Sequence, residues 1–297
     1  MAGFLFVNWH VDPCIFSIGS WGLRWYSLLF VGGFILGWYL FRYFCRREKV
    51  SVEVVDLLLY TLLIATIVGA RLGHCLFYQP DYYLGSWKGF LEIFMPWKGG
   101  LASHGGAIAL LLAMWWFSAR YGKRYHIDFL WLMDRLCITV AFAGCMIRLG
   151  NLFNSEIYGD VTTLPWGFIF SLNGETEPKH PTQLYEASSY LLLGLGMLAA
   201  YIGKLDRMHR GTFFGVFLVA CFGMRFIIEF IKEPQVEFEN DMLLNMGQCL
   251  SIPFIVAGVV ITVISAFRKV QCAAIHPESG KKNSGQTHYA RSLRESE

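Results

Sequence analysis

Residues 246–267 read MGQCLSIPFIVAGVVITVISAF, a run without a charged side chain. About 20 such residues form a helix long enough to cross the hydrocarbon core of a bilayer. Other runs of similar length recur along the chain, each bounded by charged residues or by Gly- and Pro-rich segments. Lipid offers no partner for backbone polar groups, so a run that crosses it must be helical. The sequence therefore predicts an all-α integral membrane protein.

The composition of the chain agrees with this prediction. Of the 297 residues, 55% are hydrophobic and only 16% are charged, a balance too apolar for a soluble domain of this length. We expect about seven transmembrane helices, at residues 20–42, 55–78, 101–118, 130–148, 183–203, 211–231 and 246–267. The third and fourth of these could instead be re-entrant, because the third begins in a Gly-rich segment and the fourth contains charged residues.

Lys and Arg are concentrated in alternate loops. One set of loops and the tail from Arg268 to Arg294 hold most of them, whereas the other set holds only Lys88, Lys98, Lys179 and Lys232. Positively charged loops face the cytoplasm, so we expect a periplasmic N-terminus and a cytoplasmic C-terminus. The same rule accounts for the net charge of +3, and no stripe of basic and aromatic residues indicates a nucleic-acid partner.

One domain accounts for nearly the whole chain. We expect residues 1–270 to form a single transmembrane domain with periplasmic loop elements, and residues 271–297 to form a disordered cytoplasmic tail. The N-terminal residues lack the basic segment and the cleavage site of a removable signal peptide. The eight cysteines show no C-x-x-C spacing, so the sequence predicts neither a disulfide framework nor a metal site.

Five arginines lie in or at the edge of the expected spans. They are Arg24, Arg71, Arg135, Arg148 and Arg225. A charged side chain within a membrane is energetically expensive and is a functional candidate for that reason. The guanidinium group stays charged and donates a planar fork of hydrogen bonds to oxyanions, which lysine cannot do. These residues therefore favour a phosphate-bearing ligand.

Arg225 and Glu229 form the first candidate constellation. Their i, i+4 spacing puts both on one face of a helix, where the carboxylate can hold the guanidinium toward a ligand. A structural ion pair that locks helix packing is an equally good interpretation of the spacing alone.

The second constellation runs from Arg148 to Gly159. It contains a cation, the amides of Asn151 and Asn154, and the carboxylate of Glu156. Such a group can bind a polar headgroup. The spacing alone favours a structural alternative, a helix C-terminus in which Arg148 lies near the negative end of the helix dipole and the Asn side chains cap turns.

The third candidate is His104, which lies among glycines that include Gly100 and Gly105. Glycines permit unusual dihedral angles and close approach of a ligand, and histidine can exchange a proton near neutral pH. A hydrogen-bonded structural histidine is the alternative. Tyr26, near the end of the first span, is by itself typical of an aromatic anchor at the membrane interface.

Taken together, these motifs resemble the prolipoprotein diacylglyceryl transferase family over nearly the whole chain. The resemblance is carried by seven ordered blocks, at residues 12–26, 69–73, 99–106, 148–159, 180–186, 225–229 and 246–253. Members of this family cross the bacterial cytoplasmic (inner) membrane with seven helices. They transfer the diacylglyceryl group of phosphatidylglycerol to the lipobox cysteine of a prolipoprotein. A thioether forms and glycerol phosphate is released, in the first step of lipoprotein maturation.

The resemblance implies that this chain is such an enzyme, acting on phosphatidylglycerol and on the signal peptide of a prolipoprotein, without a metal or another cofactor. On this basis we expect Arg148 and Arg225 to clamp the lipid phosphate. We also expect Glu229 to orient Arg225, and His104 to act as general base. The resemblance implies functional positions for Tyr26, His104, Arg148, Asn151, Glu156, Gly159, Arg225 and Glu229, and substrate contacts for Gly100 and Gly105.

The chain departs from the family pattern at Ile147, Ser155, Asp160 and Cys221. These departures leave the activity class intact and put the exact headgroup contacts in question. The main alternative from another class is a membrane transporter or channel for an anionic solute, in which the same arginines line a permeation path. Against it, the polar residues gather near the ends of the spans, and no inverted repeat is evident.

Overall fold

The computed structural model describes residues 6–19, 21–95, 99–100, 102–204, 208–233 and 243–267. Within these ranges, it describes the backbone but not the side chains of residues 18, 21, 103, 104 and 204. The expected cytoplasmic tail lies outside these residues. The long helices are α1 (Trp25–Arg47), α2 (Glu53–Phe77), α5 (Ser103–Tyr125), α6 (Phe129–Phe153), α7 (Thr182–Lys204), α8 (Thr212–Ile228) and α9 (Met246–Ala266). The shorter elements are β1 (Val7–Trp9), β2 (Cys14–Ile18), β3 (Trp21–Arg24), α3 (Pro80–Gly85), α4 (Trp87–Ile93), β4 (Phe168–Phe170) and the 3-10 helices η2 (Ser171–Asn173) and η4 (Glu229–Ile231).

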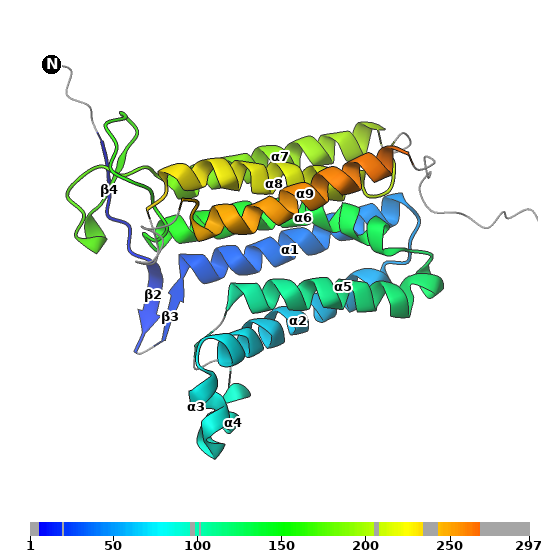
Figure 1. Ribbon diagram of the computed structural model, residues 1–297, viewed down its shortest axis with the longest axis horizontal. Helices are drawn as coiled ribbons and strands as arrows, with labels where there is room; N and C mark the ends of the chain where they lie inside the picture. The colour runs from blue at the N-terminus through cyan, green and yellow to red at the C-terminus, as the bar shows by residue number, and fades with distance from the viewer. Residues whose placement is uncertain are drawn as a thin grey trace, which may run out of the picture.

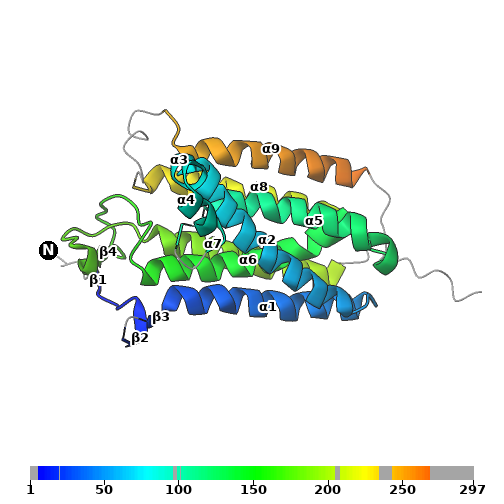
Figure 2. The ribbon, with the colours of Figure 1, turned by 90° about the horizontal axis from the view of Figure 1, so that it is seen from below.

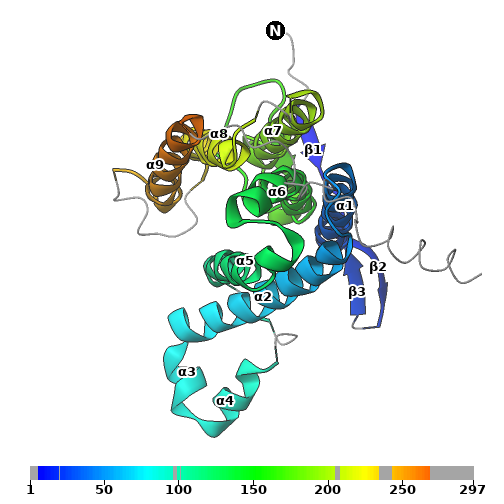
Figure 3. The ribbon, with the colours of Figure 1, turned by 90° about the vertical axis from the view of Figure 1, so that its right-hand side faces the viewer.

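The long helices run side by side, with α6 at the centre of the bundle (Figure 1, Figure 3). α6 packs against α1 and α7 and also touches α5 and α8, while α9 packs on α8 and α2 on α5. Figure 2 shows that α2 runs obliquely to α1. One end of the bundle, the strand end, carries the four short strands and residues 154–181 (Figure 1). The opposite end, the far end, carries residues 48–52 and 126–128.

Within the described residues, six helices are long and apolar enough to cross a membrane, namely α1, α2, α6, α7, α8 together with η4, and α9. They expose large apolar side chains such as Ile64, Leu192 and Val256. Exposure of so many apolar groups is unfavourable in water, whereas lipid solvates them. The prediction of a mostly helical protein that spans a membrane several times is therefore confirmed. α5 has the length of α1 but is less apolar, so the count of seven spans and the orientation stay predictions.

The helix boundaries differ from the predicted ones most at the end of α5, which reaches Tyr125 rather than residue 118, and they also differ at the start of α1. α1 begins at Trp25 rather than at residue 20, because Trp21–Arg24 form β3, which pairs antiparallel with β2. β1 and β4, far apart in the sequence, form a parallel pair that was also not predicted. The third and fourth predicted spans correspond to α5 and α6, each a continuous helix; α6 is long and apolar enough to cross a membrane, and the crossing by α5 stays a prediction.

α2 and α5 approach each other closely through glycines. A Cβ atom on Gly105 would lie 2.3 Å from the carbonyl oxygen of Gly69 and 2.6 Å from the Cα atom of Gly73. A side chain at this position would therefore push the two helices apart.

Arg71 lies on the same stretch of α2 and holds the chain that leads into α5. Its Nε donates to the carbonyl oxygen of Ile93 at 3.1 Å, and its Nη1 donates to that of Gly100 at 3.2 Å. It also bonds the carbonyl groups of Glu92 and Gly99. Backbone carbonyls thus occupy this guanidinium, so the expectation that Arg71 serves a phosphate ligand is wrong.

Arg135 belongs to a buried group at the far end. The carboxylate of Glu48 accepts hydrogen bonds from Arg135 Nε at 2.9 Å and Nη2 at 2.8 Å. It also accepts from Trp131 Nε1 at 2.6 Å and from the hydroxyl of Tyr201 at 2.7 Å. These four side chains, the far-end cluster, tie α1, α6 and α7 together. Arg135 is therefore a structural residue and not a ligand of a phosphate.

Candidate active site

Arg148 lies at the strand end of α6 and faces α7. Its Nε lies 2.5 Å from Oε2 of Glu186, and its Nη1 donates to Oδ1 of Asn151 at 3.1 Å. The Glu186 side chain is only 1% exposed. Spacing in the sequence does not pair Glu186 with Arg148, and the structure makes it the carboxylate partner of this arginine.

Lys232 extends this ion pair into a chain of alternating charges. Its Nζ lies 3.7 Å from Oε1 of Glu186 and 3.4 Å from Oε2 of Glu229. All three side chains are buried. Arg148, Glu186, Lys232 and Glu229, together with Arg225, are called the strand-end cluster below.

The predicted pairing of Glu229 with Arg225 is not formed. α8 ends at Ile228, and Glu229 begins the 3-10 helix η4, whose tighter turn changes the direction of the side chain from that of an α-helical i, i+4 position. The carboxylate of Glu229 contacts Lys232 instead. Gly247 of α9 leaves room for it, because a Cβ atom there would lie 2.4 Å from the Glu229 carboxylate.

Arg225 consequently keeps its donors free. Its Nε is buried and has no hydrogen-bond partner, and its guanidinium forms no ion pair with any residue that the structure describes. A buried cationic donor without a partner is energetically costly, so such a group is rare unless a ligand completes it.

Two asparagines hold Glu156 beside this cluster. Asn151 Nδ2 donates to Oε1 of Glu156 at 2.7 Å, and Asn154 Nδ2 donates to the same oxygen at 3.2 Å. Asn151 also accepts from Arg148. Glu156 is therefore connected to the strand-end cluster through a single amide.

The backbone around Glu156 is strained. Ser155 and Ile157 have φ angles of 53° and 62°, and a β-branched residue rarely adopts this left-handed conformation. The first turn of α7 holds the loop in place, because Thr182 Oγ1 donates to the carbonyl oxygen of Ile157 at 2.8 Å and Gln183 Nε2 donates to that of Glu156 at 2.7 Å. Strain of this kind is often found at functional sites.

Tyr26, in the first turn of α1, lies against the strand end of α6. A Cβ atom on Gly150 would lie 2.9 Å from Cδ2 of Tyr26, so the glycine permits this contact. Tyr26 also interacts electrostatically with Glu156 and Arg148. The structure thus brings Tyr26, Arg148, Asn151 and Glu156 together, and their functional roles stay predictions.

Gly159 lies in an isolated antiparallel bridge with Lys232. Its N–H donates to the carbonyl oxygen of His180 at 2.8 Å, and a Cβ atom would lie 2.2 Å from the carbonyl oxygen of Ile231. Close packing therefore accounts for this glycine, and its contact with a substrate stays a prediction.

The Gly-rich segment before α5 is only partly described. His104 lies in the first turn of α5, and its side chain lies outside the described residues. Gly105 packs on α2, while Gly100 has a φ of 70° and leaves room for His74, since a Cβ atom would lie 2.5 Å from His74 Cδ2. Packing accounts for both glycines, so their substrate contacts and the proton transfer by His104 stay predictions.

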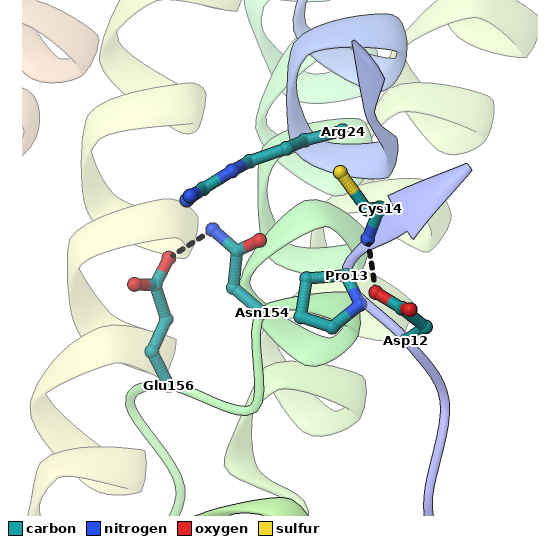
Figure 4. Close-up of a pocket in the computed structure, with 6 residues that line it drawn as sticks. All are labelled: Asp12, Pro13, Cys14, Arg24, Asn154 and Glu156. Atoms are coloured by element: carbon teal, nitrogen blue, oxygen red, sulfur yellow. Dashed lines mark hydrogen bonds between the residues drawn. The ribbon is translucent and has the colours of Figure 1, made fainter. Parts of the chain in front are cut away.

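A polar pocket of about 300 Å³ opens beside Glu156. Figure 4 shows the Arg24 side chain reaching across it toward Asn154 and Glu156. The backbone N–H of Cys14 donates to Oδ1 of Asp12 at 2.7 Å and so shapes the opposite wall. The pocket is lined by Asp12, Pro13, Cys14, Arg24, Asn154 and Glu156.

The arrangement is suited to an anion. The strand-end cluster contains three cations, Arg148, Arg225 and Lys232, against the two carboxylates Glu186 and Glu229. A bound phosphate would balance the excess positive charge and accept hydrogen bonds from Arg225. Sequence spacing identified Arg148 and Arg225 but not Lys232 and Glu186, because their pairing depends on contacts between separate elements.

Comparison with known proteins agrees with the resemblance seen in the sequence. A family model described as prolipoprotein diacylglyceryl transferase matches residues 13–264. A phosphatidylglycerol–prolipoprotein diacylglyceryl transferase of Tolumonas auensis is 44% identical over 263 residues, which cover 89% of this chain and 99% of the relative. Relatives of the same name from Porphyromonas gingivalis and Bacteroides fragilis are 43% and 40% identical, each over 86% of this chain and over 93% and 94% of their own lengths.

Proposed function

Because this chain belongs to the prolipoprotein diacylglyceryl transferase family and moves a diacylglyceryl group from phosphatidylglycerol to a prolipoprotein, we propose that Arg148 and Arg225 bind the lipid phosphate during the transfer. The enzyme acts in the bacterial inner membrane, which it crosses several times. A lipid phosphate lies near the ends of the spanning helices. The strand-end cluster lies near such ends, with Arg148 in the next-to-last turn of α6 and Glu186 in the second turn of α7.

The reaction replaces a carbon–oxygen bond by a carbon–sulfur bond. The thiolate of the lipobox cysteine attacks the glyceryl carbon that carries the phosphate. The electron pair of the broken bond stays on the oxygen, which departs as part of glycerol phosphate, and a base takes the thiol proton. Negative charge therefore grows on the phosphate, where fixed cationic donors lower the barrier most effectively.

The free guanidinium of Arg225 is the observation that carries this assignment. Arg71 and Arg135 spend their donors on backbone carbonyls and on Glu48. Arg225 has a buried Nε without a partner. Arg148 is already oriented by Glu186 and Asn151, so its donors are preorganised. The donors of Arg225 are available for a ligand.

The polar pocket beside Glu156 suits the headgroup glycerol of the lipid. Its hydroxyl groups need acceptors, which the carboxylates of Glu156 and Asp12 provide, and Arg24 supplies donors. Since Glu156 is joined to Arg148 through Asn151, a phosphate at the arginines and a glycerol in the pocket are adjacent. Gly159 shapes the loop that carries this pocket.

We assign proton removal from the thiol to His104 and a hydrogen bond to the substrate to Tyr26. A free thiol has a pKa of about 8.5, which neighbouring cations lower. The strand-end cluster therefore assists His104 by favouring the thiolate. If His104→Gln retains a near-normal rate, His104 is a headgroup ligand rather than the base.

The activity is tested with the purified protein in detergent, phosphatidylglycerol and a lipobox peptide, with a Cys→Ser peptide as control. We expect the mass of one diacylglyceryl group to be added to the Cys peptide only, with an equal amount of glycerol phosphate released. No transfer by protein shown to be folded would contradict this function and would favour transport of an anionic solute.

A further inference from the structure

Tyr190 lies beneath the strand-end cluster and has no role in the mechanism above. It lies on α7, one turn after Glu186, and is 8% exposed. Its ring packs with Cys145 of α6, Ala187 of α7 and Cys221 of α8. Three helices thus enclose a phenol group in a layer that is otherwise apolar.

The close fit of the ring depends on α6. A Cβ atom on Gly144 would lie 3.1 Å from Cδ2 of Tyr190, so this position accepts the tyrosine ring at van der Waals contact only because it lacks a side chain. The ring is therefore fixed, and with it the place of the hydroxyl group.

The hydroxyl of Tyr190 points toward the arginines. Side chains in a helix lean toward its N-terminus, and α7 begins at the strand end, where Glu186 lies. The small cluster that contains the Tyr190 ring also contacts Leu149, next to Arg148, and Cys221, one turn before Arg225, and Tyr190 interacts electrostatically with both arginines. It therefore reaches the cluster from the side of the membrane interior.

We propose that Tyr190 is a further catalytic residue, whose hydroxyl donates a hydrogen bond to the bridging ester oxygen of phosphatidylglycerol, the atom whose bond to carbon breaks. This inference rests on the proposed phosphate site of Arg148 and Arg225. A phospholipid keeps its acyl chains toward the membrane interior, so the bridging oxygen lies between the phosphate and the glyceryl carbon, on the side from which Tyr190 approaches. The two arginines serve the other phosphate oxygens.

The hydrogen bond strengthens as the reaction proceeds. The ester oxygen receives the electron pair of the carbon–oxygen bond while sulfur forms its bond to the same carbon. The Tyr190 proton stays on the phenol oxygen, because the departing phosphate needs only a donor and not a full proton. A donor at this atom therefore stabilises the transition state more than the ground state, and its removal lowers kcat with little effect on KM.

Tyr190→Phe keeps the ring on Gly144 and removes only the hydroxyl. We expect kcat to fall about 100-fold, as on loss of one preorganised donor, with the KM for phosphatidylglycerol within about twofold of the parent value. Tyr201→Phe is the matched control on the same helix, since the Tyr201 hydroxyl donates to Glu48 at the far end. We expect this variant to melt at a lower temperature and to keep the parent kcat.

A lipid analogue with sulfur at the bridging position separates a catalytic role from a structural one. Sulfur is a weak hydrogen-bond acceptor, so we expect Tyr190→Phe and the parent protein to use this analogue at similar rates. A Tyr190→Phe variant that keeps the parent kcat on phosphatidylglycerol would overturn the proposal, as would an equal loss on both lipids. Failure of the parent protein to transfer from phosphatidylglycerol would instead contradict the proposed function.

Discussion

The far-end cluster and the strand-end cluster use the same kinds of residue and differ in how completely these are paired. At the far end, Arg135 shares the carboxylate of Glu48 with Trp131 and Tyr201, and each side chain of the group has its partner. At the strand end, Arg225 keeps a buried Nε without a partner. A buried arginine with unused donors is therefore stronger evidence for a ligand than one whose donors are all paired.

The largest effect is expected at the unpaired arginine. Arg225→Lys keeps the charge but removes the planar fork of donors, so we expect kcat/KM to fall by at least about 10³-fold while the protein remains folded. Transfer to the lipobox peptide measures the loss, and the melting temperature in detergent serves as the folding control. A folded variant with near-normal transfer would show that Arg225 does not bind the phosphate.

The paired arginine should behave in the opposite way. Arg135→Ala leaves the carboxylate of Glu48 buried without its cation, which costs about 3–5 kcal/mol of stability. We expect a much lower denaturation midpoint, and a turnover per folded molecule close to that of the parent. Loss of turnover in molecules shown to be folded would remove the distinction between the two clusters.

Lys232 connects two carboxylates and should have an intermediate effect. Lys232→Met removes the positive charge between Glu186 and Glu229, so Glu186 draws Arg148 more strongly and holds it away from the phosphate. We expect kcat to fall about tenfold. Lys179→Met is the control, because Lys179 pairs with Glu233 outside the cluster and should leave kcat unchanged. Equal kcat values in the two variants would argue against this role of Lys232.

The smallest effect is expected for an exposed ion pair. Arg124 Nη2 lies 4.0 Å from Oε2 of Glu53, and both side chains are about 70% exposed. Water and salt screen such a pair, so Arg124→Ala should change the free energy of unfolding by less than about 0.5 kcal/mol. Chemical denaturation in detergent measures this value, and a loss above about 1 kcal/mol would show that exposure does not predict the energetic weight of charge pairs in this protein.

The helical core of the fold could be predicted from the sequence, because apolar runs of sufficient length have one stable form in lipid. The strands could not. β1 pairs with β4, from which several helices separate it in the sequence. A strand of three residues carries no local pattern that indicates so distant a partner. The start of α1 was placed too early because Trp21–Leu23 are as compatible with a helix as with the strand that they form.

The candidate site was predictable where function depends on residue type alone. Arg148, Asn151 and Glu156 follow one another on α6 and the adjoining loop, so their proximity is a local property. The prediction that Glu229 pairs with Arg225 was wrong because a short 3-10 helix replaces the α-helix at Glu229. Glu186 and Lys232 were missed because three-dimensional packing, and not spacing, brings them to Arg148 and Glu229.

The parallel pairing of β1 with β4 also bears on how the protein is made. The N-terminal segment is the first to be synthesised, yet its partners lie far along the chain; His10, for example, contacts Ser171, 161 residues later. At about 5–20 residues per second, a ribosome needs roughly 10–30 s to produce that stretch. The first strand must therefore wait, unpaired, until α6 and the following loop have been inserted. A bulky fusion at the N-terminus would thus interfere with this delayed pairing rather than with the insertion of the helices from α1 to α6 that precede it.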